Sequence, residues 1–449
     1  MMSVQDAATM VKGQASGGNP VFKGVSTDTR TVKAGELFVA LRGERFDGHA
    51  FLDQAKSAGA IAAMVDRNFA GASPMPAIVV DDTKLALGAL ASGWRARFAP
   101  TLIALTGSNG KTTVKEMLAA ILRQHAGNEA VLATAGNLNN DIGLPLTLLR
   151  MRDQHRCCAI ELGMNHKGEI AYLADLAAPT VALVNNAQRE HLEFMKSVEE
   201  VAAENASVYE ALPADGVAVV NADDAHAALF RKAAGKRRVI DFGLEKKALV
   251  SGGYALKGLS SEIDVRTPGG EAHATLAIPG LHNVRNALAA AACAFAVGIK
   301  EKIIGEGLSA FRPYTGRLQV KTATGGATVI DDTYNANPDS VRAAIDVLAT
   351  CPAPTVLVLG DMGEVGEQGA EFHREVGAYA RQKKIGSLLA LGEATRHAVE
   401  AFGSGGRHFA SIESLLAGIQ GRSILVKGSR FMKMERVVAA LTGAAAGGH

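Results

Sequence analysis

The segment from Thr101 to Gln124 constrains the fold of this chain more than any other stretch of its sequence. It reads TLIALTGSNGKTTVKEMLAAILRQ, which is a short apolar run, a turn with two glycines, and an amphipathic stretch. This order is typical of a buried strand, a phosphate-binding loop and a helix. We therefore expect a parallel α/β sheet with a nucleotide site at the carboxyl end of this strand.

The loop itself predicts how a nucleotide is bound. Backbone N–H groups of such a loop, together with the helix N-terminus, bind phosphates. We expect the ammonium of Lys111 to reach the β- and γ-phosphates and the hydroxyl of Thr112 to coordinate Mg²⁺. The chain departs from the strict pattern at Leu105, where the pattern has glycine, and a chance Gly-Lys-Thr turn is the alternative. The predicted ATP-binding loop consists of Thr106, Gly107, Ser108, Asn109, Gly110, Lys111, Thr112 and Thr113.

Two residues that follow later apolar strands are candidates for the metal. Mg²⁺ in proteins usually takes a carboxylate ligand, and Glu161 ends the apolar run CCAIEL. His191 follows the apolar run VALVNNA by one loop. The alternatives are a solvated charge at the end of a strand for Glu161 and a structural role for His191.

The pattern of apolar runs predicts three α/β domains. Residues 1–98 mix short strands with a helix near residues 51–60, residues 99–312 alternate apolar strands with helices around the phosphate loop, and residues 313–449 repeat that pattern. Continuous apolar strands between helices indicate parallel strands that are buried on both faces. Within 99–312 we expect strands at 156–162, 180–187, 216–224 and 237–243, and a long helix at 282–299.

Composition excludes several functions. The 47 Lys and Arg residues nearly balance the 45 Asp and Glu residues, so the net charge of +2 argues against a nucleic-acid-binding protein. The longest apolar run, 287–299, is shorter than the roughly 20 residues that span a bilayer, and no signal peptide is recognisable. Four cysteines without a CxxC pair predict neither zinc nor disulfides. We expect a cytoplasmic protein that binds small molecules.

Further motifs identify a resemblance that covers nearly the whole chain. Together with TGSNGKTT, they are STDTR (26–30), DGHAF (47–51), NLNNDIGLPLTLL (137–149), AIELGMN (159–165), HNVRNALAA (282–290), DDTYNANPDS (331–340), LGDMGEVG (359–366) and VKGSRFMKME (426–435). In this order they resemble the Mur ligase superfamily. The resemblance implies an ATP- and Mg²⁺-dependent enzyme of peptidoglycan precursor synthesis, and we expect a monomer. Such an enzyme forms the amide bond between UDP-N-acetylmuramoyl-tripeptide and D-alanyl-D-alanine through an acyl phosphate.

The resemblance also implies a role for each domain: the first binds the UDP substrate, the second is the ATPase, and the third is Rossmann-like and closes over the nucleotide and the amine. By resemblance, the UDP-substrate residues are Ser26, Thr27, Arg30, Asp47 and His49. Those that face adenine or contact the nucleotide from outside the loop are Asn283, Asn286, Arg317 and Asp332. Asn140 lines the cleft, and the catalytic set is Lys111, Asn139, His191 and Arg317. The dipeptide residues are Lys427, Ser429 and Arg430. The alternatives are that Asn283 and Asn286 brace a helix and that the KGSR segment is a solvated turn.

One position departs from the family. The family commonly has a lysine after the metal-binding histidine, and its carbamate helps to hold a second Mg²⁺; here that position is Asn205. Either Asn205 acts as a neutral oxygen ligand beside His191, or Glu204 supplies the charge, or the second site is weak. We prefer Asn205, which completes a predicted metal set of Thr112, Glu161, His191 and Asn205. A phosphate-loop switch protein without a ligation product is the competing function.

Overall fold

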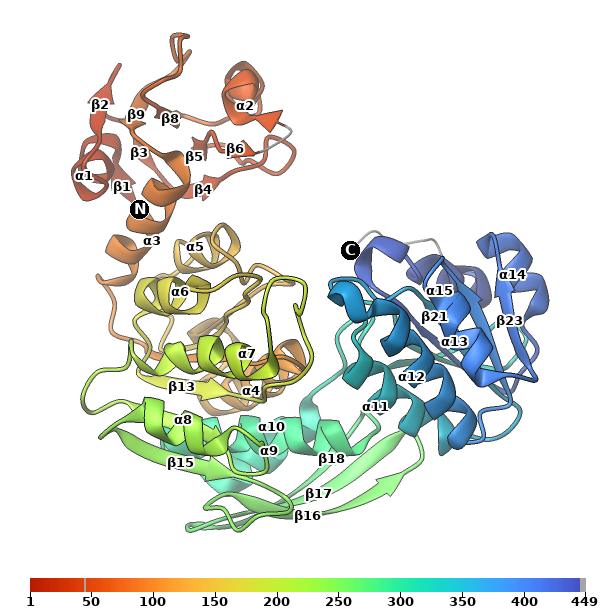
Figure 1. The fold of residues 1–449 in the computed structure, drawn as a ribbon. Coiled ribbons are helices and arrows are strands. Elements are labelled where there is room, and N and C mark those ends of the chain that lie inside the picture. The colour runs from red at the N-terminus through yellow and green to blue at the C-terminus, as the bar shows by residue number, and fades with distance from the viewer. Residues whose placement is uncertain (44–45, 445–449) are drawn as a thin grey trace.

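A computed structural model describes residues 1–43 and 46–444. The chain forms three α/β domains that follow one another along the sequence, each built on its own sheet (Figure 1). This confirms the predicted fold class. The domain boundaries, 1–98, 99–312 and 313–449, stay a prediction. None of the described helices is long and apolar enough to cross a membrane.

The N-terminal domain is a five-stranded sheet in the order β2-β9-β8-β5-β4, parallel except for β2. Successive residues of β5 point to opposite faces: Leu37 packs with α1 and α3, and Phe38 packs with α2. The elements are β1 (Met2–Ser3), α1 (Val4–Met10), β2 (Gln14–Ser16), β3 (Val21–Phe22), β4 (Gly24–Ser26), β5 (Glu36–Val39), β6 (Arg42–Gly43), β7 (Phe46–Asp47), η1 (Gly48–Phe51), α2 (Leu52–Ser57), β8 (Ala62–Asp66), β9 (Ala77–Val80) and α3 (Thr83–Arg95).

The central domain has a six-stranded, wholly parallel sheet in the order β11-β12-β10-β13-β14-β15. Its strands β10, β12, β13 and β14 are apolar because both faces are covered: Ile103 packs with α4 and α9, and Leu102 packs with α5 and α6. The expected strands and long helix are confirmed. The elements are β10 (Thr101–Thr106), α4 (Lys111–Ala126), η2 (Asn128–Ala130), β11 (Val131–Ala133), α5 (Gly143–Leu148), β12 (Cys157–Glu161), α6 (Glu169–Ala177), β13 (Val181–Val184), α7 (Val198–Ala206), η3 (Ser207–Tyr209), β14 (Val217–Asn221), α8 (Ala227–Ala234), β15 (Arg238–Phe242), α9 (Leu281–Ala296) and α10 (Glu301–Ala310).

A second sheet of the central domain was not predicted from the sequence. It is the antiparallel meander β16 (Ser251–Lys257), β17 (Ser260–Thr267) and β18 (Gly270–Leu276). Its alternating pattern leaves polar residues outside, while Ile263 and Val265 are buried in the core that also contains α9 and α10. The sheet lies along one side of these helices, at the bottom of Figure 1.

The C-terminal domain has a six-stranded sheet in the order β19-β20-β24-β21-β22-β23, parallel except for the edge strand β19. The last strand, β24, is inserted between β20 and β21, so residues near 332 and 427 lie side by side at the carboxyl end of the sheet. The elements are β19 (Gln319–Thr322), β20 (Thr328–Asp332), α11 (Pro338–Ala349), β21 (Thr355–Gly360), η4 (Gly366–Gln368), α12 (Gly369–Gln382), β22 (Ser387–Leu391), α13 (Thr395–Phe402), β23 (Gly406–Phe409), α14 (Ile412–Gly418), β24 (Ser423–Lys427), η5 (Arg430–Met432) and α15 (Glu435–Thr442).

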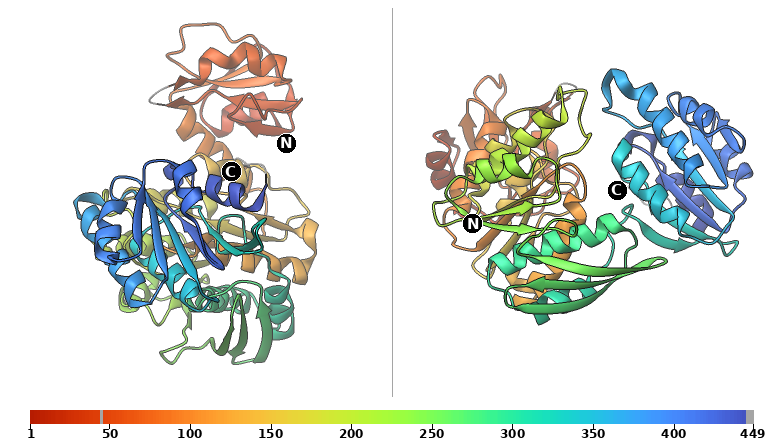
Figure 2. Two further views of the ribbon diagram at one scale, coloured as in Figure 1. Left: turned by 90° about the vertical axis from the view of Figure 1, so that its right-hand side faces the viewer. Right: turned by 60° about the horizontal axis from the view of Figure 1, so that its bottom comes forward.

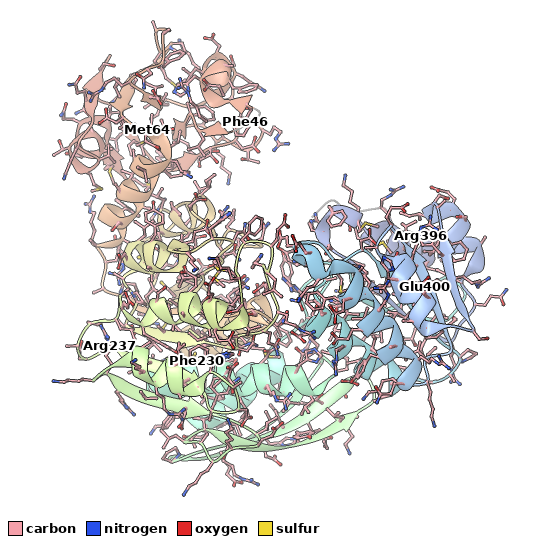
Figure 3. All side chains as sticks on the ribbon, viewed as in Figure 1. Phe46, Met64, Phe230, Arg237, Arg396 and Glu400 are labelled. Atoms are coloured by element: carbon pink, nitrogen blue, oxygen red, sulfur yellow. The ribbon has the colours of Figure 1, made fainter. Side chains whose placement is uncertain are left out.

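The N-terminal and C-terminal domains lie against different sides of the central domain (Figure 2). Figure 3 shows Met64 and Phe230 inside the N-terminal and central domains, where both side chains are fully buried. The indole N–H of Trp94, at the end of α3, donates to the carbonyl of Met151 at 3.0 Å and fastens the first domain to the second. The phosphate loop lies between the central and C-terminal domains, and residues of both line a cavity beside it.

Candidate active site

The phosphate loop connects β10 to α4 in a backbone conformation that requires glycine. Gly107 and Gly110 have φ values of +130° and +83°. A Cβ atom at Gly110 would lie 2.3 Å from the amide oxygen of Asn286. The amide nitrogen of Asn185, which follows β13, donates to the carbonyl of Asn109 at 2.8 Å. The loop is therefore held from the neighbouring strand as well as by its own helix.

Lys111 lies at the centre of this loop. Its ammonium donates to the carbonyls of Gly107 and Ser108 at 2.7 and 3.1 Å and to the carboxylate of Glu190 at 3.2 and 3.3 Å. Burial opposes ionisation of Glu190, but the charges of Lys111 and His191 lower its pKa overall. Glu190 therefore stays ionised and balances the charge of the loop lysine.

Glu161 ends β12 next to the first turn of α4. One carboxylate oxygen accepts from the hydroxyl of Thr112 at 3.3 Å and from the amide of Asn139 at 2.8 Å. The other oxygen is buried and has no hydrogen-bond partner. A buried carboxylate oxygen without a partner is costly unless a cation or donor completes it. Oxygen ligands of this kind fit Mg²⁺, and the structure places those of Thr112 and Glu161 side by side.

This arrangement is not a preformed metal cage. Within residues 1–43 and 46–444, no group of three or more His, Cys, Asp or Glu side chains is arranged to hold a metal ion. Mg²⁺ commonly takes one or two carboxylates and completes its shell with water and substrate phosphates. The oxygen atoms of Thr112 and Glu161 fit this mode of Mg²⁺ coordination.

His191 lies on the loop after β13, with a backbone φ of +53°. Its ring nitrogens lie 3.4 Å from a carboxylate oxygen of Glu190 and 2.7 Å from one of Glu364 in the C-terminal domain. Burial lowers the pKa of His191, but the two carboxylates outweigh it and raise that pKa to about 9. In this arrangement the imidazole is protonated at neutral pH, so it becomes a metal ligand only after losing a proton.

The side chain of Asn205 has hydrogen-bond partners other than His191. Asn205 is fully buried, its amide oxygen accepts from the hydroxyl of Thr106 at 2.7 Å, and its amide nitrogen donates to the carbonyl of Val201 at 2.9 Å. The side chain braces β10 against α7, and its role as a metal ligand stays a prediction. Glu204 is also engaged elsewhere, since its carboxylate accepts the backbone N–H groups of Gly168 and Ile170.

A cavity of about 480 Å³ opens on one side of the phosphate loop. The amide of Asn286 donates to the amide oxygen of Asn283 at 3.1 Å, and Asn283 donates to the carbonyl of Pro279 at 2.7 Å. The two asparagines therefore brace the start of α9 and also line the cavity, and their role at the adenine stays a prediction. Burial lowers the pKa of the neighbouring His282 to about 4. The lining includes Asn109, Gly110, Thr113, His282, Asn283, Asn286, Arg317, Asp332 and Lys427.

A second cavity, of about 450 Å³, opens on the other side of the loop. Arg317 stacks on the ring of Tyr334 at 3.9 Å and reaches the hydroxyl of Thr112 at 3.4 Å, while its Nε is buried without a partner. Both cavities therefore share the phosphate loop and Arg317. The lining includes Ser108, Lys111, Asn139, Asn140, Glu161, His191, Arg317, Tyr334, Glu364 and Lys427.

The three predicted dipeptide residues take different positions. The ammonium of Lys427 is buried, lies 2.5 Å from the carboxylate of Asp332, and lines both cavities. The hydroxyl of Ser429 accepts from the backbone N–H of Gly363 at 2.7 Å and lines neither cavity. Arg430 pairs with Glu435 at 3.3 Å. The structure thus brings Lys427 to the phosphate loop but not Ser429 or Arg430.

The predicted UDP-substrate residues lie in the N-terminal domain, away from these cavities. Asp47 accepts from the ring of His49 at 2.5 Å, and the other ring nitrogen of His49 accepts from the backbone of Asp66. The hydroxyl of Ser26 donates to the carbonyl of Asp28, whose carboxylate binds the exposed Arg30. Thr27 follows Ser26 in the same loop and is half-buried. His49 therefore supports its loop, while Arg30 keeps its outer face towards solvent.

Sequence reasoning missed several residues of the site. Glu190 directly precedes the predicted His191 and Glu364 lies inside the motif LGDMGEVG, but their respective contacts with Lys111 and His191 join positions 79 or more apart in the chain. The pair Asn185 and Asn186 directly follows the apolar run of β13, and polar residues at that edge of a parallel sheet are a usable signal. The motif contains Glu364 but does not indicate that its carboxylate pairs with His191.

Comparison with known proteins places the chain among ligases of one family. The family models described as Mur ligase family, catalytic domain, Mur ligase middle domain, and Mur ligase, glutamate ligase domain match residues 21–95, 105–294 and 316–430. A relative from Escherichia coli (strain K12), named UDP-N-acetylmuramoyl-tripeptide--D-alanyl-D-alanine ligase, is 40% identical over 449 residues, which cover 98% of each chain.

Solved structures of MurF proteins are also similar to this chain. A crystal structure of MurF from Acinetobacter baumannii superposes with a TM-score of 0.91 at 34% identity, covering 98% of this chain and 99% of that one. MurF ligase from Thermotoga maritima, solved in complex with ADP, has a TM-score of 0.81 at 24% identity, covering 94% of this chain and 98% of that one. The second likeness is one of fold alone.

Proposed function

This chain belongs to the Mur ligase family, and we propose that it is the ATP-dependent ligase that joins D-alanyl-D-alanine to UDP-N-acetylmuramoyl-tripeptide. The observation that carries the proposal is the convergence of Lys111, Arg317 and the unpartnered oxygen of Glu161 on one cavity between two domains. A phosphate and a carboxylate can meet there. MurF ligase from Thermotoga maritima, which has the same fold, was solved with ADP, and the phosphate loop of this chain supports ATP as its nucleotide.

The first chemical step brings negative charges together. The terminal carboxylate of the tripeptide attacks the γ-phosphate, ADP leaves, and an acyl phosphate forms. Two unit charges at 4 Å repel by about 4 kcal/mol at an effective dielectric of 20. Lys111 and Arg317 lie on the cavity and offset this repulsion, as fixed cations do in other phosphoryl transfers. Asn139 holds one oxygen of Glu161 by its hydrogen bond.

Mg²⁺, when bound, adds positive charge that neutralises phosphate oxygens. Thr112 and Glu161 are the residues that would hold it, and the unpartnered oxygen of Glu161 supports this assignment. His191 would join a second ion only after losing its proton. Asn283 and Asn286 would face the adenine from the first cavity, with Asp332 and Lys427 on the side of the C-terminal domain.

The second step forms the amide bond. The free amine of D-alanyl-D-alanine attacks the acyl carbonyl, the amine loses a proton, and phosphate leaves. Water competes with the amine for the acyl phosphate, so contact between the central and C-terminal domains protects the intermediate. We assign the UDP moiety to the N-terminal domain, with Ser26, Thr27 and Arg30 around it, and we propose a monomeric cytoplasmic enzyme.

The test measures ADP release with ATP, Mg²⁺, the UDP-muramoyl tripeptide and D-alanyl-D-alanine, omitting one component at a time. We expect full turnover only with all four, and a product heavier than the tripeptide substrate by the dipeptide residue mass. ATP hydrolysis that ignores both substrates would instead identify a nucleotide-dependent switch. Running the assay with diaminopimelate and lysine tripeptides in parallel identifies the third residue of the natural substrate.

A further inference from the structure

Arg189 joins two domains through a cluster of ion pairs. It lies in the loop between β13 and α7 of the central domain. Its guanidinium donates to the carboxylate of Asp339 at 2.5 to 3.2 Å and to that of Glu375 at 2.6 and 3.0 Å, both in the C-terminal domain. Its backbone N–H also donates to Asp339, at 3.1 Å. All three guanidinium nitrogens are therefore occupied by the partner domain.

The cluster is partly shielded from water. The side chains of Arg189 and Asp339 are each 24% exposed, and the guanidinium packs over the ring of Phe372 at 5.2 Å. The carboxylates raise the pKa of Arg189, and the guanidinium lowers that of Glu375. Paired, half-buried contacts of this kind contribute more than the single exposed ion pairs on the surface.

The next residue of the same loop points to the phosphate loop. Glu190 binds the ammonium of Lys111, and His191 contacts Glu364 of the C-terminal domain. A second bridge runs beside it, because the amide of Asn337, which caps α11, donates to Asn109 at 2.9 Å. Asp339 lies in the first turn of that same helix. The loop 189–191 and the start of α11 thus connect the phosphate loop to the third domain.

We propose that Arg189 is a positioning residue that docks the C-terminal domain against the phosphate loop through Asp339 and Glu375. It acts through these two carboxylates and not on the reactants. Its effect on ligation rests on the proposed function, whereas its effect on docking does not. Loss of Arg189 leaves two facing carboxylates without their shared cation, so the third domain separates more often and water reaches the acyl phosphate.

The chain offers a matched control for this residue. Arg342 also pairs with Glu375, at 2.6 Å, and stacks on Tyr379, but all three lie within the C-terminal domain. Arg342→Ala therefore removes an arginine from the same carboxylate without cutting the link between domains. Arg189→Lys keeps the charge but loses the forked geometry, and we expect it to lie between wild type and Arg189→Ala.

Domain docking is measured first, by small-angle X-ray scattering of the full chain at low and high salt. We expect a larger radius of gyration for Arg189→Ala than for wild type and Arg342→Ala, and we expect high salt to remove the difference. Melting temperatures show whether each variant is folded. If Arg189→Ala does not fold, Glu375→Gln in an otherwise wild-type chain replaces it. Equal radii for Arg189→Ala, Arg342→Ala and wild type would overturn the proposal.

The consequence for chemistry is measured as ADP released per amide formed, together with the KM for D-alanyl-D-alanine. For Arg189→Ala we expect about a tenfold rise in KM and an increased ratio of ADP to amide. Arg342→Ala should stay within about twofold of wild type. Combining Arg189→Ala with Glu375→Gln should cost less than the sum of the two single changes, since they break one link. Additive effects, or an unchanged ratio, would contradict the proposal. A wild-type chain that forms no amide would refute the proposed function and leave the scattering result to decide the docking role.

Discussion

Two glutamates flank the phosphate loop, and the structure gives them opposite surroundings. Among the described residues, Glu161 accepts hydrogen bonds from the neutral side chains of Thr112 and Asn139, and its other carboxylate oxygen has no hydrogen-bond partner. Glu190 lies between two cations, Lys111 and His191. The two glutamates therefore have different roles. A carboxylate without a cation attracts one from solution, whereas a carboxylate that is already paired sets the position and charge of its neighbours.

The largest effect is expected at Lys111, the ion-pair partner of Glu190. Lys111→Ala should retain the fold, since the side chain contacts only the loop carbonyls and Glu190. It should lower kcat for ligation by about 10³-fold or more, because the phosphate charge loses its fixed counter-ion. Circular dichroism and the ligation assay check the two parts. Near-normal ligation would refute the phosphate-loop assignment.

The second prediction separates the two glutamates by metal dependence. Glu161→Gln should raise the Mg²⁺ concentration needed for half-maximal activity by about tenfold or more, since it removes the carboxylate that accepts from Thr112. The matched change Glu190→Gln should leave that concentration nearly constant. Magnesium titrations of both variants, by activity and by calorimetry with ADP, measure the difference. Equal shifts in the two variants would show that the two glutamates do not differ in their effect on Mg²⁺ dependence.

The third prediction concerns pH. The pKa of His191 is raised to about 9 in the folded protein, above its unfolded value near 6.5. Its protonated form therefore contributes stability fully below about pH 6.5, and this contribution is lost as pH rises through about 9. We expect Glu190→Gln to lower the pKa of His191, as measured by NMR titration of the imidazole. Between about pH 6.5 and about pH 9, the unfolding free energy of Glu190→Gln should therefore fall by less than that of wild type. An unchanged pKa of His191 in the Glu190→Gln variant would contradict the ion pair between Glu190 and His191.

The smallest effect on ligation is expected at Asn205, whose side chain hydrogen-bonds to Thr106 and Val201. Asparagine forms no carbamate, so ligation should be unchanged in CO₂-depleted buffer. A loss of activity restored by bicarbonate would show that a lysine elsewhere is carbamylated. By contrast, Asn205→Ala should lower the melting temperature, because it leaves the buried hydroxyl of Thr106 without its acceptor.

Local sequence was sufficient to predict Glu161 as a site residue, but not Glu190. Glu161 directly ends a buried strand, and Lys111 and Thr112 follow a glycine-containing turn, so short-range patterns identify all three. The parallel pairing of β10 with β12 then brings them together. The antiparallel sheet β16-β17-β18 was missed, although its residues alternate, because the preceding repeat of strands and helices dominates that region.

The sequence by itself determined the α/β fold, the phosphate loop and the family, because these depend on residues within a few positions of one another. Only the tertiary structure decided the charges around the loop. Arg189 meets Asp339 and Glu375 from 150 and 186 positions away, and Lys111 meets Glu190 from 79. It also decided that Asn205 is a buried brace, since its partner Thr106 is 99 positions distant. Electrostatic surroundings depend on which side chains meet across strands and domains, and that information is absent from any local pattern.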